Sequence, residues 1–94
     1  MIIAQVVGNL WATRKEEALV GRKLMIVQPM RLDGTLTGEC IVAVDAVDAG
    51  VGEMVLVATG SSARRAEGQE NSPVDASIVA IIDIHEVQRA GGTE

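Results

Sequence analysis

Short apolar stretches recur along this chain, and glycine, proline, aspartate or asparagine residues separate them. Each stretch is rich in β-branched residues, and the first one follows a period of two residues, not the period of a helix. This pattern is typical of β-strands. The sequence therefore predicts five strands, at approximately residues 2–13, 23–30, 39–47, 54–59 and 77–87.

The first predicted strand shows the alternation most clearly. Its even positions are apolar, whereas its odd positions mix polar and apolar side chains and include Trp11. Gly8 lies near the middle, where a glycine usually permits a bend or the close approach of another backbone. We expect the even positions to face a core, and these residues are Ile2, Ala4, Val6, Leu10 and Ala12.

Turn signals lie between the predicted strands. The pair Asp33-Gly34 predicts a hairpin, and the glycine-rich stretch 48–53 predicts a second tight turn. Residues 62–67 are the one helical candidate. Five strands and a short helix predict an all-β fold, a small barrel of the oligonucleotide-binding type. We expect one domain over residues 1–88 and a flexible tail over residues 89–94.

The last predicted strand is apolar on both of its faces, and the third and fourth strands share this property. A small barrel has only one interior, so the second apolar face needs another cover. A helix, a loop or another subunit could provide it, because large exposed apolar patches are uncommon in monomers. Two-sided strands in so small a chain predict an oligomer.

Composition narrows the classes of function. The chain has 94 residues, one Trp, no Tyr or Phe, and a formal net charge of −5. Acidity and the presence of only one aromatic ring argue against nucleic acid as a partner, since that role needs clustered cations and several stacking surfaces. The amino terminus lacks the basic region of a signal peptide, and no apolar run is long enough to span a membrane. We expect a soluble, cytoplasmic protein.

Candidate catalytic residues are few. His85 is the only histidine and follows Asp83 by two positions, so a triad with Ser61 or Ser62 can be drawn, but no G-x-S-x-G motif accompanies it. Cys40 is the only cysteine and flanks a strand, which is typical of a small core residue. One Cys and one His cannot provide a structural zinc site within a subunit.

The carboxylates show no spacing typical of a general acid and base pair. We therefore predict that the chain is not an enzyme and that it has no metal site and no cofactor. We interpret the following carboxylates as solvated charges of turns and strand ends: Glu16, Glu17, Asp45, Asp48 and Glu53.

The stretch TGSSARRAEG, residues 59–68, combines a glycine, two serines and two arginines after an apolar strand. Its serines could cap a short helix, and its backbone amides could bind an anion beside the arginines. It is not a phosphate-binding loop of the G-x-x-x-x-G-K-[ST] kind. For one isolated loop, the helix cap is the better-supported interpretation.

Three segments carry motifs in a recognisable order: GNLWATRKEEALVGRKLMIVQP, VAVDAVDAGVGEMVLVATGSSAR and SPVDASIVAIIDI. Together they resemble the EutN/CcmL family, the pentameric vertex proteins of bacterial microcompartment and carboxysome shells. The family's G-S-S-A-R and P-V-D-A motifs are intact, and its L-x-G-x-K-L signature includes Gly21 and Lys23. Asp48 departs from the pattern, because the family usually has glycine there.

The resemblance implies a homopentamer that fills the five-fold corners of a polyhedral shell built with hexameric shell proteins. Five copies of the GSSAR loop would then gather near the axis and could attract an anion at the pore. Trp11 would be either a partly covered surface residue or an interface anchor. The alternative function is an oligonucleotide-binding or small-anion-binding module. The residues that the resemblance places at the subunit interface or near the pore are Gly60, Ser61, Ser62, Ala63, Arg64, Pro73, Val74, Asp75 and Ala76.

Overall fold

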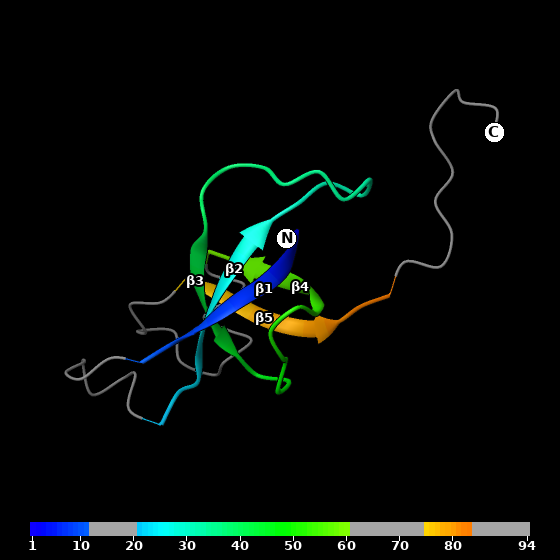
Figure 1. Ribbon diagram of the computed structural model, residues 1–94. Helices are drawn as coiled ribbons and strands as arrows, with labels where there is room; N and C mark the ends of the chain where they lie inside the picture. The colour runs from blue at the N-terminus through cyan, green and yellow to red at the C-terminus, as the bar shows by residue number, and fades with distance from the viewer. Residues whose placement is uncertain (12–20, 61–74, 84–94) are drawn as a thin grey trace, which may run out of the picture.

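The computed structural model describes residues 1–11, 21–60 and 75–83, which form a closed five-stranded barrel (Figure 1). The order of strands around the barrel is β1-β2-β3-β5-β4. The predicted all-β barrel is therefore confirmed, while the predicted helix at 62–67 and the tail at 89–94 lie outside the described residues. The strands are β1 (Ile2–Leu10), β2 (Leu24–Pro29), β3 (Ile41–Asp45), β4 (Met54–Thr59) and β5 (Ala76–Ile81).

Antiparallel pairing accounts for four of the five contacts between strands. β1 pairs with both β2 and β4, β2 pairs with β3, and β4 pairs with β5. The barrel closes through a parallel contact between β3 and β5, which joins Val44 to Ser77 and Asp45 to Ile78. This contact links segments far apart in the sequence, and it is the shortest pairing in the barrel.

The core is aliphatic, as the near absence of aromatic residues requires. Inward-facing side chains come from all five strands, and short residues such as alanine alternate with longer ones so that a narrow interior is filled. Each fully buried valine or isoleucine stabilises the fold by roughly 1.5–3 kcal/mol. The side chains of this core include Ala4, Val6, Met25, Val27, Ala43, Ala49, Val55, Val57, Ala76 and Ile78.

β1 contains a bulge at the position where a bend was expected. Val6 lies opposite Val27, but the next matched residue is Gly8, which lies opposite Ile26. One extra residue reverses the faces that later positions present. The prediction that Leu10 shares the inner face with Val6 is therefore wrong, and Leu10 is 38% exposed. A Cβ added to Gly8 would be 3.7 Å from Ile26 Cδ1, an ordinary contact, so the bend needs no close approach.

Both predicted turns are confirmed. Gly34 has a φ of +89°, and the backbone amide of Arg31 donates to the carbonyl of Thr35 at 2.8 Å across the hairpin. In the second turn, the amide of Glu53 donates to the carbonyl of Gly50 at 3.1 Å. Within the described segments, no helix has the length and apolarity that a membrane span requires.

The strands are generally shorter than predicted. The structure begins β3 at Ile41 and ends it at Asp45, because the Asp45 carboxylate accepts a hydrogen bond from the amide of Val47 at 2.9 Å and turns the chain. Gly38, with a φ of +65°, separates the hairpin from β3. The predicted first and last strands are too long, because Trp11, Ile82 and Asp83 are described and lie beyond the ends of β1 and β5. The rest of these two predictions, residues 12–13 and 84–87, lies outside the described residues.

The outer face of the barrel is also apolar, as the two-sided strands predicted. One row of residues crosses β2, β3, β5 and β4 on this face and is buried within the chain, although it points away from the core. Elsewhere the outer face is open, and Val7 and Val42 are 44% and 42% exposed. The buried outer row consists of Leu24, Val44, Ser77 and Ala58.

Candidate functional site

The end of β4 and the start of β5 bring together parts of the GSSAR and PVDA motifs, which the sequence analysis identified as candidate interface residues. Thr59 pairs with Ala76, and the amide of Gly60 donates to the carbonyl of Asp75 at 2.7 Å. Gly60 has a φ of +68°, a conformation that L side chains rarely adopt, so this turn favours glycine. The GSSAR and PVDA motifs thus meet at one edge of the barrel.

The two described residues of the PVDA motif have different surroundings. Ala76 is 4% exposed and belongs to the core, whereas Asp75 is exposed beside Gly60. Burial of Ala76 fixes the start of β5, and the backbone carbonyl of Asp75 is held by the amide of Gly60. The other residues predicted at the subunit interface or near the pore, 61–64, 73 and 74, lie outside the described residues.

Trp11 lies just beyond the end of β1 and is 88% exposed. Its odd number in the sequence does not show which face of the barrel it is on, because the bulge before Gly8 changes the alternation of inward and outward residues along β1. It borders a pocket of about 550 Å³ between the end of β1 and the start of β2. The pocket combines apolar walls with two cationic residues and is lined by Asn9, Leu10, Trp11, Gly21, Arg22, Lys23 and Leu24.

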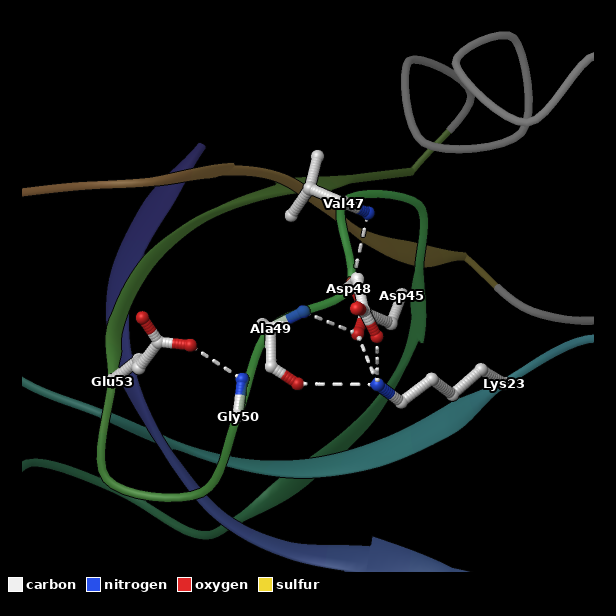
Figure 2. A network of polar contacts seen from close by, with 7 residues as sticks. All are labelled: Lys23, Asp45, Val47, Asp48, Ala49, Gly50 and Glu53. Atoms are coloured by element: carbon white, nitrogen blue, oxygen red, sulfur yellow. Dashed lines mark hydrogen bonds and ion pairs between the residues drawn. The ribbon is translucent and has the colours of Figure 1, made fainter.

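Lys23 holds the β3–β4 loop to the start of β2 (Figure 2). Its Nζ atom lies 2.9 Å from Asp48 Oδ1 and 3.3 Å from Asp45 Oδ2, and it donates to the carbonyl of Ala49 at 3.3 Å. The Asp45 side chain is completely buried, whereas that of Asp48 is 95% exposed. The ammonium group therefore bridges a buried carboxylate and an exposed one.

The Asp45 carboxylate also organises the backbone of this loop. Its Oδ1 accepts from the amide of Val47 at 2.9 Å, and its Oδ2 accepts from the amide of Ala49 at 2.7 Å. Farther along, Glu53 Oε1 accepts from the amide of Gly50 at 2.6 Å (Figure 2). A buried carboxylate is tolerated here because several donors satisfy its lone pairs.

The ion pair between Lys23 and Asp48 shifts the pKa of both groups. The hydrogen bond that Lys23 donates to Asp48 raises the pKa of Lys23 above its ordinary value of 10.5; desolvation opposes this shift, and the contact with Asp45 adds to it. The same hydrogen bond from Lys23 lowers the pKa of Asp48 below its ordinary value of 3.8. Both groups are charged at neutral pH.

Two interpretations of polar residues need correction. Asp45 is not a solvated turn charge, because its carboxylate is buried and accepts two backbone hydrogen bonds. Cys40 is not a core residue, because it is exposed and its Sγ lies 3.1 Å from Gln28 Oε1. An aspartate at the end of a strand often accepts a hydrogen bond from the backbone amide two residues later, as Asp45 does from Val47, and this preference could have suggested the turn but not the burial of the carboxylate.

The structure does not assemble a catalytic arrangement from the described residues. Asp83 is exposed beyond the end of β5, and its hypothetical partners His85, Ser61 and Ser62 lie outside the described residues. In the described part of the chain, no three His, Cys, Asp or Glu side chains gather as metal ligands would. The polar network around Lys23 instead ties a loop to a strand.

Comparisons with known proteins decide the family. The family model described as ethanolamine utilisation protein EutN/carboxysome matches residues 1–83, which include all five strands of the barrel. The chain belongs to the EutN/CcmL family. A relative in Salmonella typhimurium, the bacterial microcompartment shell vertex protein EutN, is 41% identical over 83 residues, which cover 88% of this chain and 84% of that protein.

Solved structures of EutN/CcmL proteins have the same fold. CcmL of Nostoc sp. PCC 7120 superposes with a TM-score of 0.83 at 46% identity and covers 90% of this chain and 93% of its own. GrpN of Rhodospirillum rubrum, described as a pentameric microcompartment shell protein, gives a TM-score of 0.83 at 39% identity. That match covers 94% of this chain and 100% of GrpN.

Proposed function

We propose that this chain is a structural vertex protein of a bacterial microcompartment shell and that it acts as a homopentamer without catalysing a reaction. The observation that carries the proposal is the family match across the whole barrel, together with the similarity in structure to pentameric GrpN. In this role the protein is located in the cytoplasm, within the shell, and its partners are copies of itself and hexameric shell proteins.

The function follows from shape. A layer tiled only by six-fold units stays flat, and a closed polyhedron needs five-fold units at its corners. Five copies of one barrel form a closed ring through heterologous contacts, in which one surface of each subunit meets a different surface of the next. Such contacts would also cover part of the apolar outer face that a single barrel leaves open.

Within this pentamer, we assign the edge that contains Gly60 and Asp75 to the subunit interface or to the neighbourhood of the pore. The support is that the two motifs meet there and that Asp75 is exposed beside a glycine turn. The remaining GSSAR and PVDA residues belong to the same proposal. An anion held by the GSSAR loops on the five-fold axis, and Trp11 as an interface anchor, are further parts of it.

The oligomeric state tests the central claim. Light scattering on the purified chain should give a mass five times that of the 9.9 kDa subunit. Coexpression with a hexameric shell protein should give closed particles, and omission of this chain should leave open or tubular assemblies. A well-folded monomer at high concentration would contradict the proposal.

Substitution Arg64→Glu tests the assignment of the GSSAR motif. We expect it to weaken the pentamer or shell closure, because reversal of charge at a packed junction is unfavourable. Sulfate density on the five-fold axis of a crystal would support the anion. Unchanged assembly and closure in the variant would reject the assignment and leave the vertex function intact.

A further inference from the structure

The parallel contact between β3 and β5, here called the seam, has the least backbone support of any joint in the described barrel. It matches residues 44–45 of β3 with residues 77–78 of β5. All other neighbouring strands of this barrel are matched over longer stretches. Parallel pairing is also slightly less stable for each residue than antiparallel pairing. The closure of the barrel therefore depends on its shortest and weakest pairing.

The end of β3 is held more closely on one side than on the other. The amide of Asp45 donates to the carbonyl of Lys23, just before β2, at 2.8 Å. The next amide, of Ala46, donates across the seam to the carbonyl of Ile78 at 3.4 Å. Most backbone hydrogen bonds span about 2.7–3.2 Å, so the bond across the seam is a long and weak one.

A buried hydroxyl makes the closed seam less favourable. Ser77 lies in the seam between Val44 of β3 and Ala58 of β4, and it is completely buried. Its Oγ has no hydrogen-bond partner in the part of the chain that the structure describes. An uncompensated polar group is costly to keep away from water. Separation of β3 from β5 gives water access to this hydroxyl, which lowers the free energy needed to open the seam.

Separation at the seam leaves the rest of the sheet intact. β3 remains paired with β2, β5 remains paired with β4, and β1 joins the two halves because it pairs with both β2 and β4. The opened barrel is therefore a single sheet that has lost one joint. Opening does expose core residues such as Ala43 and Ile78, so the open form is a minor species.

We infer that the barrel opens at the seam while its other strands stay paired, as a conformational device built into the fold. The half that contains β4 and β5 carries the turn in which Gly60 bonds to Asp75, and the half that contains β2 and β3 carries the ion pairs of Lys23. Opening lets these two sites move relative to each other without loss of hydrogen bonds inside either one. The inference concerns a single barrel and does not rest on the proposed pentamer.

Thiol labelling measures the opening. Ala43→Cys places a thiol in the core beside the seam, and Ala4→Cys is a matched control in β1, which lies opposite the seam in the ring of strands. Both alanines are 0% exposed. Each variant is made in a Cys40→Ser background, treated with excess iodoacetamide and followed by mass spectrometry. Without denaturant, Ala43→Cys should react at least about ten times faster than Ala4→Cys, because a local opening costs less free energy than global unfolding.

The dependence on urea separates opening of the seam from unfolding of the whole barrel. Opening exposes little surface, so the labelling rate of Ala43→Cys should rise only slightly at low urea concentrations. The rate for Ala4→Cys should rise steeply, because that thiol reacts only after global unfolding. Equal rates with equal urea dependence, or slower labelling of Ala43→Cys, would overturn the inference.

Hydrogen exchange of the unmodified chain covers the case in which a cysteine variant does not fold. The amides of Asp45 and Ala46 are neighbours, and of these two the Ala46 amide bonds across the seam. After correction for intrinsic rates, NMR should show that the Ala46 amide exchanges at least about ten times faster, with little dependence on urea. Equal protection of both amides, with the same steep dependence on urea, would overturn the inference.

Discussion

The loops that join β2 to β3 and β3 to β4 are held in contrasting ways. The β3–β4 loop depends on contacts with the barrel. The side chains of Asp45 and Lys23 bind its backbone, and the amide of Gly52 donates to the carbonyl of Val6 at 2.8 Å. The hairpin between β2 and β3 is closed largely by its own turn, with Leu32 and Leu36 both 56% exposed. One loop is therefore an extension of the core, and the other is a local structure.

Replacement of Asp45 should show the largest difference in stability between the two loops. Asp45→Ala leaves two part-buried amides without their acceptor and removes one of the partners of the Lys23 ammonium, so we expect a loss of about 3 kcal/mol in the free energy of unfolding. Urea denaturation at fixed chain concentration measures it. Asp33→Ala, which removes the acceptor 2.9 Å from the Thr35 amide in the hairpin, is the control and should change stability by less than about 1 kcal/mol.

Ser77 extends the comparison to a buried polar group without support. Its Oγ is buried and has no hydrogen-bond partner among residues 1–11, 21–60 and 75–83, in contrast to the Asp45 carboxylate. Ser77→Ala should therefore raise the free energy of unfolding by about 1 kcal/mol, because an unsatisfied hydroxyl no longer has to be desolvated. Thermal unfolding by circular dichroism checks the sign, and a lower melting temperature would show that the hydroxyl has a partner in solution.

Asp48 tests how much of the β3–β4 loop depends on its backbone and how much on the ion pair. Its φ of +59° is the only positive value at a non-glycine residue in the described segments. Asp48→Gly relieves the backbone and loses the ion pair, whereas Asp48→Ala loses the ion pair and keeps the strain. We expect the alanine variant to melt a few degrees below the glycine variant. Equal melting temperatures would mean that the backbone strain is negligible.

The contribution of the ion pair should depend on pH at both extremes. The raised pKa of Lys23 means that its contribution is present below 10.5 and is lost as pH rises through the folded value. The lowered pKa of Asp48 means that its contribution is present above 3.8 and is lost as pH falls through the folded value. The free energies of unfolding of the unmodified chain and of Asp48→Asn, measured by denaturation, should therefore differ slightly at neutral pH and converge in strong acid and in strong base.

Much of the barrel could be predicted from local pattern. The fourth strand was predicted with the bounds that β4 has, because its apolar run ends at glycine on one side and follows a turn on the other. The hairpin at Asp33-Gly34 is equally predictable, since the residues that form the turn are neighbours in the sequence. Family motifs identified the chain where composition alone indicated only a small oligomeric barrel.

Contacts between distant residues could not be predicted in this way. Alternation placed Leu10 inside, but the bulge at Gly8 depends on how β1 meets β2. A turn position suggested that Asp45 was solvated, but its burial depends on Lys23 and on closure by β5. For the candidate site, the sequence listed two motifs separately, and only pairing of β4 with β5 places Gly60 against Asp75.

The short parallel contact between β3 and β5 has a consequence for synthesis of the protein. Of the five described strands, β5 is the last to leave the ribosome, and until Ser77 and Ile78 emerge, β3 and β4 each lack a neighbour. Unpaired strand edges promote aggregation, and contacts between distant segments form slowly. The nascent chain therefore stays vulnerable until β5 has emerged, and a stop codon ahead of Ala76 would yield an open, aggregation-prone sheet.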